Sequence, residues 1–321
     1  MDAPLPECQI VWNDTGLSDW EEVFARAPRA NLLQSPGYAR AICPPLGQRP
    51  RHGRILIDGS LAGVFQIQEA QILRRAIHAV ILDRGPVWLD GYGTPDQVGA
   101  FFRAFDRTFP RRIGRKRRLL PEAPNTPEMR AALDATRLKR RPGSTGYQTV
   151  WVDLRPDLET LRATLKSRWR GALRKAEAAE LTTEWSWKGK SLLQVLTGYE
   201  QDKAERGYPG PTVGTVTDLC RTLLGHRKVL VGTASQGDRL VAAALFLCHG
   251  SGSTYQVGWT TAAGRTLSAS HLLLWQAMGE LKDAGHLDLD LGGVNDADAK
   301  GVKSFKEGLG GETVELVGQY E

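Results

Sequence analysis

The stretch DLGGVNDADAKGVKSFKEGLGG, residues 290–311, has a glycine pair near each end and three lysines at every third position, the last of them Lys306. It begins at the end of the alternating residues Leu287, Leu289 and Leu291, a pattern typical of a strand. It matches neither the glycine spacing of a phosphate-binding loop nor the ligand spacing of a metal site. Its meaning therefore has to be sought in the rest of the chain.

Length and composition favour a folded protein with two domains. The chain has 321 residues, of which 41% are hydrophobic and 24% charged, and a single hydrophobic core rarely extends beyond about 250 to 300 residues. No apolar run approaches the roughly 18 residues of a membrane span, and the start MDAPLPECQIVW lacks the regions of a signal peptide. We therefore expect a cytoplasmic protein. The net charge of +6 favours an anionic partner such as nucleic acid, a nucleotide or a phospholipid headgroup.

The chain lacks the common motifs for metals, nucleotides and serine nucleophiles. The cysteines Cys8, Cys43, Cys220 and Cys248 are far apart, which indicates free thiols in a reducing compartment. The six histidines form no H-x-H or H-E-x-x-H pattern, and no G-x-S-x-G, Walker A or Rossmann glycine motif occurs. We expect neither a metal site nor a bound cofactor.

The two halves of the chain repeat one order of elements. The first half predicts helices near 18–27, 35–42 and 95–109 and strands around the Asp58-Gly59 turn. The second half predicts a strand at 149–154, a long amphipathic helix at 157–181, a hairpin around 236–238 and a helix at 269–285. This order predicts an α/β fold with mixed α+β sheets, in two domains at 1–146 and 147–321. The last segment is a candidate to pack back on the first domain, and the seam lies near KRRPGSTGYQT, 139–149.

Two basic segments each have two interpretations. RRIGRKRR, 111–118, is either a nucleic-acid contact or the solvated entry of a strand. In the long helix, four basic residues step by four beside an apolar stripe, either to contact a phosphate backbone or as an ordinary solvated face. These residues are Arg162, Lys166, Arg170 and Arg174.

Asp288 and Asp290 share one face of a strand and either act as a pair or close the strand end.

The segment TYQVGWTTAAGRTLSASHLLLWQAM, 254–278, predicts a strand, a loop and a helix. In GNAT-type acetyltransferases such a frame presents backbone amides to the pyrophosphate of coenzyme A. The loop Thr261–Thr266 departs at both ends from the usual glycine pattern of that site. The frame is thus present without the coenzyme A fingerprint.

Several segments together resemble the FemABX family of aminoacyl-tRNA-dependent peptidyltransferases. The segments are LLQSPGYARA (32–41), LDRGPVWLDG (82–91), YQTVWVDL (147–154), SRWRGALRKAEAAEL (167–181), AERGYPG (204–210) and DLGGVNDADAKGVKSFKEGLGG (290–311). They run in order over nearly the whole chain, and similar features recur in GNAT proteins of unassigned substrate. The resemblance implies two tandem GNAT-like acyltransferase domains.

The resemblance also implies site residues. Lys306, after Phe305, matches the lysine of the F-K-x-G-[FL]-G segment, which lies where the aminoacyl ester meets the acceptor amine. There a cation stabilises the oxyanion of the tetrahedral intermediate. Arg206 matches an arginine that holds acceptor phosphates, and Tyr255 matches a tyrosine of the substrate channel. Arg40 stands near a lysine with a similar task, and Lys303 completes the expected substrate-binding residues.

The expected function is transfer of an amino acid from aminoacyl-tRNA to an amine on a cell-wall precursor, a peptide or a small metabolite, which forms an amide bond. The basic residues Arg162, Lys166, Arg170 and Arg174 are then expected to hold the tRNA. An acyl-CoA-dependent GNAT N-acyltransferase is the alternative on the same fold. A third interpretation is a non-catalytic RNA-binding protein, which would keep the basic helix but would not need Lys306.

Overall fold

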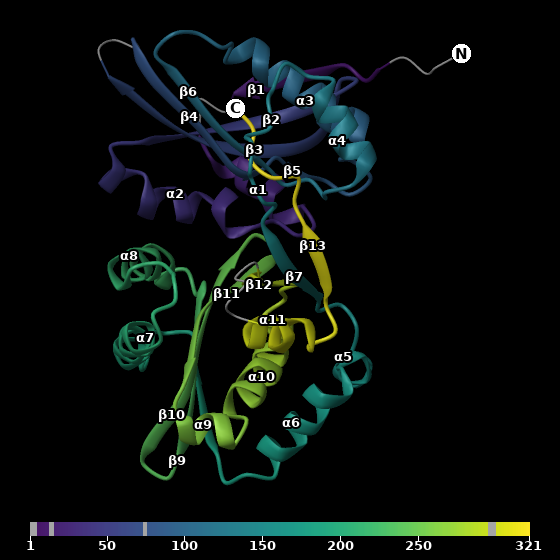
Figure 1. Cartoon of the computed structure of the whole chain (residues 1–321). Helices are drawn as coiled ribbons and strands as arrows, with labels where there is room; N and C mark the ends of the chain where they lie inside the picture. Colours follow the sequence, from purple (N-terminus) through teal and green to yellow (C-terminus); the bar gives the residue numbers. More distant parts are fainter. Residues whose placement is uncertain (1–4, 13–15, 73–75, 295–299) are drawn as a thin grey trace. The chain divides into compact units, whose positions relative to one another are not determined.

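The computed structural model describes residues 5–12, 16–72, 76–294 and 300–321, and shows an α/β protein with two mixed sheets (Figure 1). This confirms the predicted fold class. The chain divides into two compact units. One consists of Met1–Gln148 together with Val314–Glu321, and the other is Thr149–Thr313.

The first unit is built on a sheet with the order β1-β2-β3-β4-β6, in which β5 pairs with β3. Its strands are β1 Cys8–Trp12, β2 Arg49–Ile57, β3 Ser60–Ile72, β4 Ile77–Gly85, β5 Val87–Trp88 and β6 Arg115–Pro121. Its helices are α1 Ser18–Arg26, α2 Pro36–Ile42, α3 Pro95–Thr108 and α4 Pro127–Asp134, with short 3-10 turns η1 Leu32–Gln34 and η2 Pro44–Leu46. Helices α3 and α4 pack a phenylalanine-rich core on one face, and α1 covers the other face.

The second unit has a sheet with the order β13-β7-β12-β11-β10-β9-β8. Its strands are β7 Gln148–Asp153, β8 Thr182–Ser186, β9 Val229–Gln236, β10 Arg239–His249, β11 Gly252–Thr260, β12 Asp288–Gly293 and β13 Glu312–Glu315. Its helices are α5 Leu158–Thr164, α6 Ser167–Glu177, α7 Leu192–Arg206, α8 Val213–Leu224, α9 Ala262–Thr266, α10 Ala269–Asp283 and α11 Lys300–Glu307. Helices α5, α6 and α10 cover one face of the sheet, and α7 and α8 cover the other (Figure 1).

The prediction of a single long helix at 157–181 is wrong, because two helices occupy this range. The backbone is extended at Leu165 and Lys166, which separates α5 from α6. Leu165 is buried in the core, and the amide of Lys166 donates to the carbonyl of Gly308 at 3.0 Å. A tertiary hydrogen bond thus replaces a helical one at this point, which the amphipathic pattern of the sequence does not reveal.

The two glycine-rich ends of the 290–311 segment let the chain pass close to its neighbours. Gly292 and Gly310 have φ of +72° and +88°, a region that favours glycine. A Cβ on Gly310 would lie 2.7 Å from the carbonyl oxygen of Thr164, and one on Gly311 would lie 2.5 Å from that of Trp151. The second glycine pair therefore allows the chain to return from α11 along α5 and β7.

Within the described ranges, no helix combines the length and the apolar character that a membrane span requires.

Candidate functional site

The candidate site lies where two parallel strands of the second unit separate. Strand β11 pairs with β12 only over Gly252–Thr254 and Asp288–Asp290. Beyond this point β11 continues beside β10, whereas β12 turns at Gly292 so that Gly293 pairs with Thr149 of β7. The divergence opens a fork in the sheet, and backbone groups at such a fork can meet a ligand.

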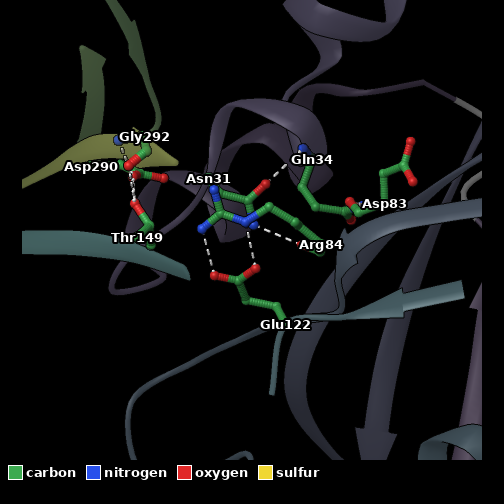
Figure 2. Close-up of polar contacts among 8 residues, drawn as sticks. All are labelled: Asn31, Gln34, Asp83, Arg84, Glu122, Thr149, Asp290 and Gly292. Carbon is green, nitrogen blue, oxygen red and sulfur yellow. Dashed lines mark hydrogen bonds and ion pairs between the residues drawn. The ribbon is translucent and has the colours of Figure 1, made fainter. Parts of the chain in front are cut away.

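Asp290 fixes the turn at the fork. Its carboxylate is buried and accepts hydrogen bonds from the hydroxyl of Thr149 and from the amide of Gly292, the latter at 2.8 Å (Figure 2). Asp288, two residues earlier, instead accepts from the Arg155 guanidinium at 3.1 Å. Because each aspartate has its own partners, the geometry favours the strand-closing interpretation over an acid–base pair.

Lys306 lies at this fork. Its side chain belongs to α11 and is only 9% exposed, and Nζ donates to the carbonyl of Gly293 at 2.9 Å. A Cβ placed on Gly292 would lie 3.7 Å from Nζ and 3.5 Å from the carbonyl oxygen of Tyr255. A larger residue at position 292 would thus fill the space between the lysine and β11, so the glycine keeps that space open.

An aromatic cluster holds α11 in position. The indole of Trp169 donates to the carbonyl of Phe305 at 3.1 Å, and the ring of His271 lies 4.9 Å from both aromatic rings. A Cβ on Gly308 would come within 2.6 Å of the Trp169 ring. Burial lowers the pKa of His271 to about 4, so this imidazole packs as a neutral ring. The cluster therefore sets where the residue after Phe305, Lys306, can reach.

Arg206 pairs with a carboxylate, Asp202, that the sequence analysis does not single out. Asp202 accepts a hydrogen bond from Tyr208 at 3.1 Å and pairs with Arg206 at 3.6 Å. Burial raises the pKa of Tyr255, and the charge of Asp202 adds to this rise. The Tyr255 hydroxyl lies directly over Gly258, where a Cβ would collide with it. The signal in the sequence was the spacing of Asp202 and Arg206 by one helical turn in YEQDKAERGY.

The other two predicted substrate residues, Lys303 and Arg40, each lie close to a carboxylate within their own unit. Lys303 lies on α11, but its side chain is 43% exposed and pairs with Glu307 at 3.8 Å. Arg40 belongs to the first unit, where it is half exposed and lies 3.8 Å from Glu21.

The predicted basic stripe is divided by the break between α5 and α6. Arg162, on α5, forms two hydrogen bonds of 2.7 and 2.6 Å with Glu177 at the end of α6. Lys166 is the N-cap residue that precedes α6, and its side chain is exposed. Arg170 is half-buried, and Arg174 is exposed. Arg162 is thus committed to a structural ion pair, and Lys166, Arg170 and Arg174 form the shorter basic face that remains.

The first unit contains a buried polar network that joins two of the segments that carry the resemblance, 32–41 and 82–91, through Gln34 and Asp83. The guanidinium of Arg84 binds Glu122 through two hydrogen bonds of 2.7 and 2.8 Å (Figure 2). The backbone carbonyl of Arg84 accepts a hydrogen bond from the side-chain amide of Asn31 at 2.7 Å. The side-chain amide of Gln34 donates to the backbone carbonyl of Asp83 at 2.8 Å. Arg84 adopts φ of +51°, which these contacts maintain. The segments around Asn31 and Arg84 are therefore held together by polar groups that the sequence analysis did not assign.

The glycine of the loop at Thr261 packs closely against the sheet. The amide of Gly264 donates to the hydroxyl of Thr261 at 3.1 Å. A Cβ on Gly264 would collide with the carbonyl of Val241 on β10. The glycine of this loop thus serves close contact with the sheet, and its amide already has a partner.

Comparisons with known proteins agree with this architecture. The family model described as an acetyltransferase (GNAT) domain matches residues 161–307. The solved structure of FemX is similar over 94% of both chains, with a TM-score of 0.76 and 16% sequence identity. No curated protein matches this chain.

Two further solved structures share the fold. One is the C-terminal domain of an Agrobacterium fabrum protein named as a putative lysylphosphatidylglycerol synthetase. The match covers 93% of this chain and 91% of that structure, with a TM-score of 0.53 and 16% sequence identity. The other is a Bacteroides thetaiotaomicron protein of unknown function. The match covers 97% of this chain and 98% of that structure, with a TM-score of 0.57 and 12% sequence identity. The chain therefore has a FemX-like fold of two GNAT-like domains, which confirms the expected resemblance at the level of fold. The family model over residues 161–307 indicates an acyltransferase.

Proposed function

We propose that this protein transfers an amino acid from aminoacyl-tRNA to an amine and so forms an amide bond. The observation that supports the proposal most directly is Lys306, a buried lysine whose Nζ lies at a fork between two strands. The FemX-like fold agrees with it, because the FemABX resemblance implies the same donor and the same class of acceptor.

The reaction needs little from the protein beyond alignment and charge. The acceptor amine attacks the ester carbonyl, a C–N bond forms, and the negative charge passes to the carbonyl oxygen. When that oxyanion collapses, the C–O bond to the tRNA ribose breaks, and the proton lost by the amine ends on the ribose hydroxyl. An α-amine with a pKa near 8 is partly neutral at pH 7, so a strong protein base is not required.

Lys306 fits the role of the oxyanion stabiliser. A donor fixed in a water-poor site needs no reorganisation when charge develops, and it acts more strongly there than in water. The hydrogen bond to Gly293 and the cluster around Phe305 hold the lysine in position before substrate arrives. Tyr255 and Arg206 are proposed to contact the acceptor. Arg206 is suited to a phosphate because its planar guanidinium presents several N–H donors.

An acyl-CoA-dependent N-acyltransferase is the second candidate, because the matching family model is that of a GNAT acetyltransferase domain. The loop at Thr261 argues against it, since Gly264 there is committed to packing and to Thr261.

A donor competition assay tests the two candidates. The purified full chain is incubated with a panel of amines and either a mixed pool of charged tRNA or acetyl-CoA, and amide products are identified by mass spectrometry. Products from the charged tRNA alone support the proposal. Products from acetyl-CoA alone, together with a micromolar and salt-insensitive coenzyme A complex in calorimetry, would replace it with the second candidate.

A further inference from the structure

Exposed isoleucines gather at one end of the first unit's sheet. Ile72, Ile77 and Ile113 are 60%, 50% and 99% exposed. Ile72 and Ile77 are directly paired across β3 and β4, so their side chains stand on the same face of the sheet. The alternate positions of β4, His78 and Val80, are buried, so the isoleucines point away from the core.

The third isoleucine lies in the loop that leads into β6, against the same hairpin. The amide of His78 donates to the carbonyl of Gly114 at 2.8 Å, and a Cβ on Gly114 would collide with the carbonyl of Ala76. Gly114 has φ of +80°, so glycine is needed for both the conformation and the close approach. Ile113 is thereby held beside the residues that flank Ile77.

Three exposed basic residues lie within three positions of Ile113 in the sequence. Arg111, Arg112 and Lys116 are exposed, and Nη1 of Arg112 donates to the carbonyl of Ala76 at 3.4 Å. Arg111 lies 3.5 Å from a carboxylate oxygen of Glu321, with both side chains about half exposed, so part of the positive charge is offset there. This end of the sheet is therefore an apolar tip with a basic rim.

The other arginines of the RRIGRKRR segment have structural partners. Arg117 is buried and donates to Asp106 at 2.6 Å, and Arg118 donates to Asp83 at 2.6 Å. The predicted basic segment therefore divides into Arg117 and Arg118, which form ion pairs within the unit, and the exposed residues Arg111, Arg112 and Lys116.

We propose that the patch formed by Ile72, Ile77, Ile113, Arg111, Arg112 and Lys116 docks on an anionic phospholipid surface. Aliphatic side chains are stabilised at the boundary of the acyl chains, and basic side chains are attracted to anionic headgroups. Recognition of RNA relies on cations together with aromatic or hydrogen-bonding side chains, because bases are bound by stacking and by their polar edges. Three exposed isoleucines favour the membrane over RNA. The proposal does not depend on the transfer reaction.

The test is flotation of the full chain with vesicles of pure phosphatidylcholine or of phosphatidylcholine mixed with phosphatidylglycerol. We expect binding to the anionic vesicles that weakens with added salt. Replacing Arg111, Arg112 and Lys116 with Gln should lower the partition coefficient about fivefold for each charge removed. Ile113→Ser should lower it about tenfold, because the apolar insertion is removed, and Ile113→Trp should raise it.

Leu193→Ser is the matched control, because Leu193 is 79% exposed but belongs to the second unit. Its partition should equal that of the wild type. The proposal is overturned if the wild-type chain does not float with anionic vesicles, or if the patch variants float as well as the control. It is also overturned if the Gln variant loses tRNA binding in a gel shift while Ile113→Ser leaves vesicle binding unchanged, since the patch would then be an RNA contact.

Discussion

At the scale of single residues, Lys306 carries most of the proposed chemistry. Burying an amine is costly unless its hydrogen bonds are satisfied, and here a backbone carbonyl at 2.9 Å helps to satisfy them. The same carbonyl holds Nζ at the fork between β11 and β12, where a substrate carbonyl could take up a neighbouring position. A buried lysine held at the end of a strand pair is therefore a candidate for function.

Lys306→Ala is expected to reduce turnover by roughly 10² to 10³, the scale of losing one oxyanion donor. Lys306→Arg should retain more activity than the alanine variant because it keeps the charge. Single-turnover rates and circular dichroism of both variants are the measurements. Arg221→Ala is the control, since Arg221 is an exposed residue of α8 paired with Asp218. Wild-type turnover in a well-folded alanine variant would remove Lys306 from the mechanism.

His271 gives a pH-dependent prediction. Its folded-state pKa is about 4, below the ordinary value of 6.5, because burial disfavours the charged ring. The unfolded chain therefore takes up a proton at a higher pH than the native protein does. The stability that His271 contributes is complete above pH 6.5 and is lost as the pH falls from 6.5 towards 4.

His271→Gln should accordingly lose less stability than the wild type over that pH range. Urea unfolding above pH 6.5 and near pH 4 measures the difference. Burial also lowers the pKa of His52, His78 and His286, so some acid sensitivity should remain in the variant. His226→Gln is the matched control at an exposed position. Equal acid sensitivity in His271→Gln and in the control would contradict the prediction.

At the scale of elements, the break between α5 and α6 changes what the basic stripe can do. Arg162 of α5 links the two helices by its ion pair with Glu177 at the end of α6. This pairing lowers the pKa of the Glu177 carboxylate. The residues that can still meet a polyanion are therefore those of α6. A solvated face would look similar, so a salt titration has to separate the two interpretations.

Replacing Arg170 and Arg174 with Gln is expected to weaken aminoacyl-tRNA binding about equally for different tRNAs. Ion pairs with phosphates carry no sequence information, and removing each of them should lower the slope of log affinity against log salt by somewhat less than one. Apparent donor constants at two ionic strengths provide the measurement, and saturation by the acceptor should barely change. Coincident slopes for wild type and double variant would show that the stripe is only surface.

At the scale of the whole molecule, the end of the chain completes the first unit. Tyr320 is fully buried in that core, and its backbone bonds to Leu119 of β6 in both directions, at 2.9 and 2.8 Å. Val317 donates to the carbonyl of Ala123 at 3.0 Å. The first unit is therefore built from both ends of the sequence, so it can close only after the second unit has been synthesised.

Tyr320→Ala should destabilise the first unit by about 3 to 5 kcal/mol, the usual cost of removing a large aromatic side chain from a core. Tyr320→Phe should be nearly neutral, because no described residue bonds the buried hydroxyl that it removes. Limited proteolysis followed by mass spectrometry reports which unit opens. Cleavage confined to Thr149–Thr313 in the alanine variant would contradict this assignment.

Local patterns in the sequence were enough to predict the fold class and most of the elements. Alternation and helical spacing involve neighbouring residues alone, so the hairpins at Asp58 and Gln236 and the helix at 269–285 could be predicted without knowledge of any distant contact. The glycine pairs around Lys306 likewise marked an unusual segment before its surroundings were known.

The break at Leu165, the partners of Asp290 and the burial of Lys306 could be seen only in the folded chain. The first two depend on residues far away in the sequence, Gly308 and Thr149, and the hydrogen bond of Lys306 depends on how the chain turns back towards Gly293. The same holds for RRIGRKRR, which reads as one basic block but divides by strand alternation into buried and exposed arginines. Periodicity predicts on which face of a helix or strand a side chain lies. It does not predict which residues pack against that face. That is set when distant segments pack together, and both the fork at Lys306 and the patch around Ile113 arise at this step.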